Sequence, residues 1–373
     1  MMKIRVRAIL LLCSLALLGN AAFVSAQTPG EATAARDPME ILPASDVVVF
    51  VDMRRILTEV IPRLLARSPA VLGKLTASLN EINQKTGINV LSINRIAVGV
   101  HLFDPATASS MKKSNFGVVI IARGDFDSNR LVPALRRELK ERFHEETYGG
   151  RTIYSELKTP AEPLTETVAL SLLDTSTLAI GDLAQVRATI DAGAGRGQVD
   201  PALVQLARRD AGSLVGAAAI VPPALSKSIS EDVSGGDEMG NKLAGAVSAI
   251  RQLFCSVGMT PTNFQMLLGA RFEKAEQAAS VSDLLLGVRQ QTLPQVEDKT
   301  LHDLMARLQL TAQGEDLQLT IDVSNAEAQE LVTSIVNDGQ AKPAAQGKKP
   351  SRQAAPTNKR RSTRQRRSTR RRG

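Results

Sequence analysis

The end of the chain carries a dense cluster of cationic side chains. From residue 360 to 373, eight of the fourteen residues are arginine, and Arg361-Ser-Thr-Arg364 recurs as Arg367-Ser-Thr-Arg370. Guanidinium groups at this density bind polyanions by releasing counterions and by donating paired hydrogen bonds to phosphate or carboxylate oxygens. The candidate polyanion-binding residues are Arg360, Arg361, Arg364, Arg366, Arg367, Arg370, Arg371 and Arg372.

The net charge of +8 combines two segments of opposite sign. Residues 340–373 hold 13 cations and no acid, whereas residues 27–339 hold 30 cations against 38 acids and carry −8. The tail has no apolar side chain larger than alanine, so it cannot bury enough surface to offset the entropy cost of ordering. We therefore expect a disordered Arg/Lys-rich tail at 340–373. It contacts an anionic polymer or membrane surface, or it folds back on the acidic body.

The first 26 residues have the layout of a secretory signal peptide. Lys3, Arg5 and Arg7 precede an apolar run of eleven residues, and small side chains at 24–26 precede Gln27. A membrane-spanning helix needs about 20 apolar residues, so a cleaved peptide at 1–26 is favoured over an anchor. The sequence thus predicts an exported protein, periplasmic or on the cell surface, that begins with a polar leader at 27–41.

Export leaves Cys255 as the single thiol of the mature chain, because Cys13 lies within the signal peptide. An intramolecular disulfide is then impossible, and stability must come from packing. Cys255 follows Ile250, Leu253 and Phe254 near the end of a helical pattern, which predicts a small buried hydrophobe. A nucleophile is disfavoured, since no Lys, Arg or His stands immediately beside it to lower the pKa of its thiol.

Several short motifs imitate catalytic or metal sites without the required context. Ser110-Met-Lys-Lys113, Ser92-Ile-Asn94 and Lys85-Thr-Gly87 match three motifs of serine penicillin-interacting enzymes, but in reversed order. Asp125-Phe-Asp-Ser-Asn129 opens like a calcium loop, yet arginines stand at loop positions six and twelve, so helix capping is favoured. The three histidines lack paired metal-ligand spacing. The sequence predicts no catalytic residue, no metal and no cofactor.

The body between the two ends alternates strand and helix patterns. β-Branched and apolar runs predict strands at 47–51, 95–103, 116–123, 152–157, 168–173 and 177–180. Apolar residues at three- and four-residue spacing predict helices at 56–64, 72–82, 127–139 and 183–192. Asp127 is the expected N-cap of the third helix. The order favours an α+β fold with a mixed or antiparallel sheet covered by helices.

A shift of 168 residues aligns much of the apolar pattern with itself. Val47 falls on Val215, Ile82 on Ile250 and Ile96 on Phe264, among nine apolar matches. The repetition predicts two tandem similar halves, at 42–197 and at 198–339, the second being shorter. The alternative is that two αβ segments align by chance. The groove between the halves is, by position, the expected place for a ligand.

Two segments of the first half resemble a wider group of proteins. Leu42-Pro-Ala-Ser-Asp46 before a strand, and Gly124-Asp-Phe-Asp127 before an amphipathic helix, are similar to exported bacterial proteins of unknown function whose folded part opens with a Leu-Pro-Ala-Asp element. The resemblance covers about the first half of the chain and implies an envelope location with no known chemistry. The second half departs from it, because the Gly-Asp-Phe-Asp turn has no counterpart there.

Together these features favour an exported, non-enzymatic envelope protein. Its body would bind a partner or ligand, and its basic tail would contact anionic envelope polymers or lipid headgroups. An aromatic content of 3% without Trp disfavours stacking sites for sugars or single-stranded nucleic acid. Two alternatives stay open: an exported hydrolase with a site between the halves, and a nucleic-acid-associated protein acting through the tail.

Overall fold

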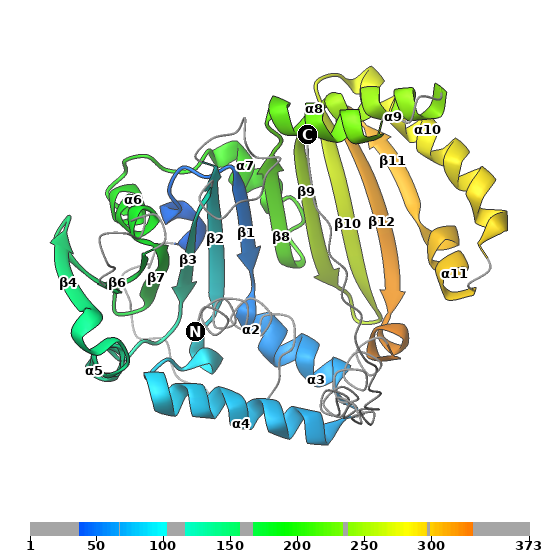
Figure 1. Cartoon of the computed structure of the whole chain (residues 1–373). Helices are drawn as coiled ribbons and strands as arrows, with labels where there is room; N and C mark the ends of the chain where they lie inside the picture. The colour runs from blue at the N-terminus through cyan, green and yellow to red at the C-terminus, as the bar shows by residue number, and fades with distance from the viewer. Residues whose placement is uncertain are drawn as a thin grey trace, which may run out of the picture. The chain divides into compact units, whose positions relative to one another are not determined.

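The computed structural model describes residues 37–66, 68–102, 116–156, 167–233, 238–296 and 299–330. The strands are β1 (Val47–Val51), β2 (Arg95–Leu102), β3 (Phe116–Arg123), β4 (Phe143–Tyr148), β5 (Arg151–Glu156), β6 (Val168–Asp174), β7 (Thr177–Asp182), β8 (Ser213–Ile220), β9 (Ile250–Met259), β10 (Asn263–Phe272), β11 (Gln309–Gln313) and β12 (Asp316–Ser324). They form one twelve-stranded sheet in the order β11-β12-β10-β9-β8-β1-β2-β3-β7-β6-β5-β4, with antiparallel pairing throughout (Figure 1).

Helices connect the strands and cover parts of the sheet. They are α2 (Met53–Arg55), α3 (Ile61–Leu64), α4 (Pro69–Thr86), α5 (Ser128–Leu139), α6 (Leu183–Gly193), α7 (Pro201–Ala207), α8 (Pro223–Val233), α9 (Glu238–Ser248), α10 (Ala275–Thr292) and α11 (Lys299–Arg307). A short 3₁₀ turn, η1 (Pro38–Ile41), precedes β1, and a further helix begins at Asn325. The predicted α+β class, with an antiparallel sheet and covering helices, is confirmed. Among the described residues, no helix is long and apolar enough to span a membrane.

Local sequence signals fix several helix ends as expected. The Asp127 side chain accepts a hydrogen bond from the Asn129 N–H at 2.9 Å, which caps α5. Gly87 ends α4 with φ of 77°, a left-handed conformation that glycine adopts without a Cβ penalty. The segment Asp125–Asn129, which opens like a calcium loop, therefore begins a helix. Lys85-Thr-Gly87, which matches a motif of penicillin-interacting enzymes, ends one.

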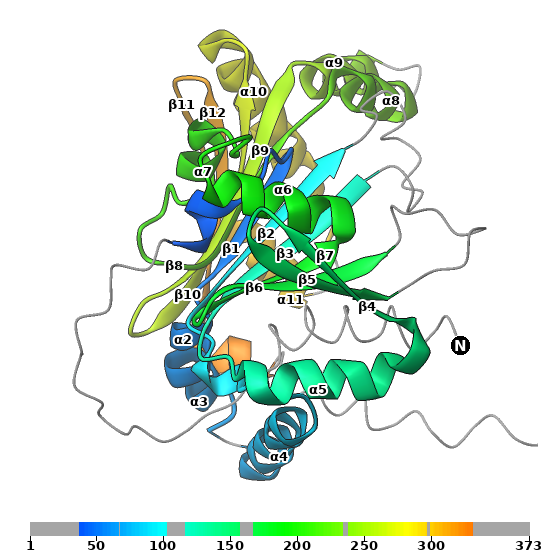
Figure 2. The ribbon, with the colours of Figure 1, turned by 90° about the vertical axis from the view of Figure 1, so that its left-hand side faces the viewer.

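The pleat gives the sheet two faces with separate cores. Face 1 carries Val48, Val119 and Phe254 and packs against η1, α6 and α7. Figure 2 shows α6 lying across β6 and β7, and α4 and α5 together at one end of the sheet. Face 2 carries residues such as Val51 and Ala122, which α2 to α5 cover near that end.

The two predicted halves share one continuous sheet instead of forming a sheet each. β1 pairs with β8, with Val49 opposite Ala217. Outward from this pair, the order is β1-β2-β3-β7-β6 on one side and β8-β9-β10-β12-β11 on the other. The offset of 168 does not hold for every pair of residues that it aligns, because Ile82 lies in α4 whereas Ile250 opens β9. The similarity of the halves and their boundary at 197 stay predictions.

Within the first half, one strand was not expected from the sequence. Residues 143–148 form β4 at the sheet edge and include the charged run His144-Glu-Glu146. An edge strand exposes its flanks to water and tolerates charged side chains, so the local composition resembles that of a solvated helix terminus.

Candidate binding surface

Apolar side chains form continuous rows across face 2. In the middle row, strand pairing places Leu310 beside Leu319, Leu319 beside Leu268, and Leu268 beside Cys255. The row continues through Ala217, Val49, Val98, Ile120, Ile180, Leu170 and Tyr154. Adjacent strands lie about 4.8 Å apart, so the part from Leu310 to Val49 spans about 24 Å.

Four side chains of face 2 are exposed although they lie in the interior of long strands. Leu268 is 55% exposed, Met266 48% and Leu253 41%, and Cys255 beside them is exposed as well. We call these four residues the apolar strip. Burying a Leu or Met fully contributes about 1.5–3 kcal/mol, so leaving three of them in water forgoes several kcal/mol. A contiguous apolar patch of this kind marks an interaction site.

The strip lies between two covered regions of the same face. On one side, Phe264 and Met259 join the cluster formed with α2 to α5. On the other, Ala270 and Leu317 pack against α10. The strip is therefore the part of face 2 in β9 and β10 that neither group of helices covers.

The outer strands direct their polar side chains to the opposite face. Along β12, Leu317, Leu319 and Ile321 alternate with Gln318 and Thr320. Alternation of this kind is the normal pattern of a half-buried strand, in which the apolar side packs against a core. In β9 and β10 that apolar side is instead left partly open, which makes the strip the strongest candidate surface.

Cys255 belongs to this strip and not to a buried core. It lies in β9, so the prediction of a buried position near a helix end is wrong. Desolvation by its surroundings raises the pKa of the thiol, and a backbone hydrogen bond involving Ala217 only partly offsets this. A raised pKa keeps the sulfur protonated at neutral pH, and a protonated thiol is a poor nucleophile.

A cavity of about 610 Å³ lies at the sheet edge, two strands away from the strip. Its walls include Leu286 and Arg289 of α10, Arg307 of α11, Leu310 of β11 and Asp322 of β12. We call it the edge cavity. Because Leu310 also starts the middle apolar row, the edge cavity and that row share one apolar wall.

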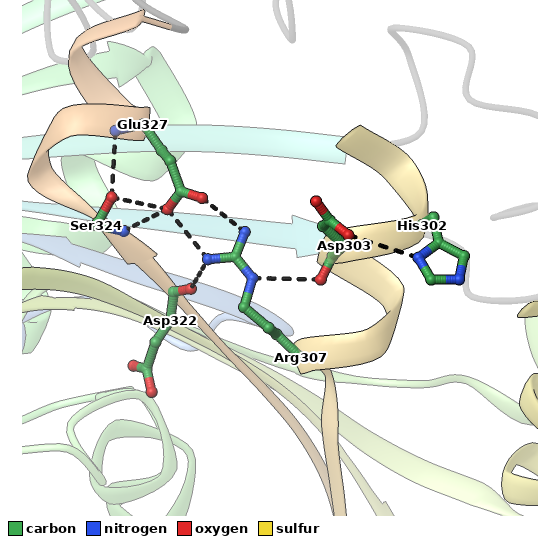
Figure 3. A network of polar contacts seen from close by, with 6 residues as sticks. All are labelled: His302, Asp303, Arg307, Asp322, Ser324 and Glu327. Atoms are coloured by element: carbon green, nitrogen blue, oxygen red, sulfur yellow. Dashed lines mark hydrogen bonds and ion pairs between the residues drawn. The ribbon is translucent and has the colours of Figure 1, made fainter. Parts of the chain in front are cut away.

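A polar network fixes the side of this cavity next to the last described helix (Figure 3). Arg307 donates to both carboxylate oxygens of Glu327, at 3.1 and 2.8 Å, and the Ser324 N–H donates to Glu327 at 2.8 Å. The hydrogen bond from Arg307, followed by those from Ser324, lowers the pKa of Glu327 to about 2. The Glu327 N–H donates back to the Ser324 hydroxyl, completing a capping box at the start of the helix from Asn325.

A second cavity, of about 420 Å³, lies where β1 meets β8. Its lining comes from both sides of residue 197 and includes Asp37, Phe50, Arg95, Arg208 and Ser213. This is the position expected for a ligand between the halves. Its charged groups pair with each other, since Arg95 donates to Asp37 at 2.6 Å and Arg208 donates to the other oxygen of the same carboxylate.

The electrostatics of this junction are those of a structural cluster. Burial alone would raise the pKa of Asp37, but the hydrogen bond from the Met39 N–H and the charges of Arg208 and Arg95 outweigh it and lower the pKa. Ser213 donates its hydroxyl to the Asp210 carbonyl oxygen at 2.6 Å. No histidine is among the described residues that line the cavity, and the Ser213 hydroxyl donates to a backbone carbonyl oxygen and not to a side-chain base. The hydrolase alternative gains no support from it.

The predicted site residues are distributed as follows. The eight tail arginines and Ser110-Met-Lys-Lys113 lie outside the described residues. His101 contacts Asp46, with Nδ1 at 3.1 Å from the carboxylate, and His302 contacts Asp303 at 3.5 Å. Within the described part of the chain, no group of three or more His, Cys, Asp or Glu side chains is arranged to hold a metal ion.

Sequence reasoning missed the apolar strip, although part of its signal was present. The alternation from Leu317 to Val323 indicates one apolar face, but it does not show whether a helix covers that face. Coverage depends on where helices from distant parts of the chain pack.

Comparisons with known proteins give limited information. No family of proteins and no curated protein matches the sequence. Among solved structures, crystal forms III and IV of TP0453 are similar over 81% of this chain and 100% and 97% of that chain, at 10% identity and TM-scores of 0.41. Crystal form I gives 0.39 over 98% of that chain. A likeness this low establishes neither a shared fold nor a shared function.

Proposed function

We propose that the chain is an exported, non-enzymatic envelope protein that binds a long-chain amphiphile. The apolar strip takes the hydrocarbon part, and the basic tail contacts anionic headgroups or polymers of the envelope. The observation that carries the proposal is the exposure of Leu268, Met266 and Leu253 in the interior of β9 and β10.

The dimensions of the strip favour a chain-like ligand over a protein partner. A stable protein interface buries about 800 Å² on each partner, contributed by about 20–30 residues. Four exposed side chains between two covered regions provide much less, and they lie side by side on two neighbouring strands, which suits a single hydrocarbon chain. A second copy of the chain is thus the less favoured occupant.

The charges of the chain favour an amphiphile with an anionic group. The tail carries +13 and the segment before it −8, so the cations are concentrated in one place. A protein that has both an apolar surface and a cationic segment binds anionic lipids through two additive contributions, apolar burial and electrostatic attraction.

Leu268→Asp tests the strip. We expect it to weaken binding of the uncharged fluorophore Nile red, and of a long-chain alcohol that displaces it, by at least about tenfold, because a carboxylate must be desolvated against the ligand. Since Leu268 is 55% exposed, the melting temperature should change little. Fluorescence titration of the wild type and the variant measures both affinities.

Gln265→Asp is the matched control for Leu268→Asp. Gln265 is an exposed residue of the same strand, one residue before Met266 and therefore on face 1. It should leave Nile red affinity unchanged. Equal affinity in all three proteins would contradict the proposal, as would sedimentation showing that the strip is closed by a second copy.

Truncation after Gln340 tests the tail. We expect the melting temperature to stay nearly constant, while retention on heparin or on phosphatidylglycerol vesicles is lost. Binding by the full chain should fall steeply with salt, because thirteen cations release counterions. A chain in which the eight arginines become lysines separates charge from paired hydrogen bonding. Equal retention with and without the tail would contradict its role, and stronger retention on nucleic acid than on vesicles would favour the nucleic-acid alternative.

A further inference from the structure

We propose that the edge cavity binds the phosphate-bearing headgroup of the amphiphile whose hydrocarbon chain lies on the apolar strip, with Arg289 as the phosphate contact. This inference rests on the proposed function and adds the headgroup class and the residue that selects it. Three observations support it, and they concern the position, the charge and the other polar groups of the cavity.

The position of the cavity allows one ligand to occupy both places. Leu310 lines the cavity and pairs with Leu319, and Leu319 pairs with Leu268 of the strip. Two strand spacings of about 4.8 Å separate Leu310 from Leu268, so the cavity lies about 10 Å from the most exposed strip residue. A volume of about 610 Å³ accommodates a polar headgroup.

Arg289 has a different kind of partner from Arg307, the other arginine of the cavity. The two terminal nitrogens of Arg289 donate to the carbonyl oxygens of Leu308 and Ala306, at 2.8 and 2.7 Å. These carbonyl groups lie at the C-terminal end of α11, so they orient the guanidinium and offset only part of its charge. Arg307, in contrast, forms an ion pair with Glu327 at 2.8 Å. Among the described residues that line this cavity, Arg307 forms an ion pair with a carboxylate, whereas Arg289 donates to backbone carbonyl oxygens. Arg289 is therefore the residue that we expect to bind an anion.

The other polar side chains of the cavity lining do not face Arg289. The strand register places the side chains of Asp322 and Gln309 on face 1, opposite to Leu310. Asp322 instead turns its backbone carbonyl oxygen toward Arg307, and its carboxylate points away (Figure 3). The one acidic residue among the described lining residues therefore does not oppose an anion at Arg289, which favours a phosphate-bearing headgroup over an uncharged one.

Competition by two amphiphiles with the same acyl chain tests the assignment. Full-length protein loaded with Nile red is titrated with a monoacyl phosphoglycerol and with the matching uncharged monoacylglycerol, both below the concentration at which they form micelles. The titration is done at high salt to screen the tail. We expect the wild type to prefer the phosphoglycerol compound by about tenfold, as for a charge-assisted contact.

Substitutions of Arg289 distinguish recognition of the phosphate charge by its guanidinium from a purely structural role of this residue. Arg289→Gln should reduce the preference below about threefold while leaving the affinity for the uncharged compound unchanged. Arg289→Lys keeps the charge and should retain most of the preference, although it loses the paired carbonyl contacts. Arg54→Gln, at an exposed position of α2, should behave as the wild type.

Three outcomes would overturn the inference. They are an unchanged preference in Arg289→Gln, a parallel loss for both compounds in Arg289→Gln and Arg289→Lys, and preference for a fatty acid of the same chain. Failure of the wild type to bind even the uncharged compound would instead contradict the proposed function of the strip.

Discussion

Gly216→Val is expected to lower the free energy of unfolding by about 3 kcal/mol, at the upper end of the range for overpacking. A Cβ on Gly216 would overlap the carbonyl oxygen of Ala207 and the ring of Phe50. The backbone carbonyl cannot rotate away as a side chain could. The ring is held in place as well, since the Arg208 guanidinium lies 5.9 Å from its centre. Urea unfolding with an unchanged slope measures the loss.

Gly73→Ala is the matched control for Gly216→Val. Gly73 lies inside α4, and a Cβ there would meet nothing within 4 Å. Alanine restricts the unfolded chain and favours the helix, so stability should rise by about 0.5–1 kcal/mol. Similar losses in both variants would show that glycine is needed for general chain flexibility and not for the close approach at Gly216.

The same arrangement recurs on the next strands, which gives the junction its rigidity. A Cβ on Gly269 would overlap the ring of Phe254, and the Arg209 guanidinium lies 4.8 Å from the centre of that ring. Consecutive arginines after α7 thus cover two phenylalanines, each seated over a glycine of a neighbouring strand. The packing holds β8 between β1 and β9 and stabilises the sheet that presents the strip.

Local patterns predicted the first half of the fold well. The strand at 116–123 has the bounds expected from its β-branched run, and Asp127 and Gly87 end helices as their chemistry requires. These features depend on neighbours in sequence, where a cap or a continuous apolar run decides the backbone conformation.

The second half was harder because its apolar spacing fits two structures. Ile250, Leu253, Phe254 and Val257 follow helical spacing, yet they lie in β9. Pairing with β8 and β10 decides in favour of the strand, and such pairing depends on residues far away in sequence. The apolar strip could not be predicted for the same reason. Only the packing of α10 and of α2 to α5 shows which part of face 2 stays open.

Asp316→Asn is expected to lower stability at neutral pH by about 2 kcal/mol, because it leaves two guanidiniums short of their partner. Asp316 is only 7% exposed. Its carboxylate accepts hydrogen bonds from Arg271 at 2.8 and 3.1 Å and from Arg209 at 2.6 Å. It therefore joins β10 and β12 to the segment after α7. The expected loss of stability is no larger than this because both arginines are about one-third exposed and partly solvated.

The dependence of this effect on pH distinguishes an electrostatic cause from a packing defect. Burial alone would raise the pKa of Asp316, but the hydrogen bonds from Arg271 and Arg209 outweigh it and lower the pKa below 3.8. A carboxyl group with a lowered folded-state pKa contributes stability that is fully present above its unfolded pKa and is lost as the pH falls through the folded value. The stability difference between wild type and Asp316→Asn should therefore be constant from pH 5 to 7 and should narrow as the pH falls through the lowered folded-state pKa. Asp303→Asn, which removes an exposed carboxylate beside His302, should show little difference at any pH. A gap that persists in acid would mean that the amide disturbs the packing at β12, and that the ion pairs themselves contribute little.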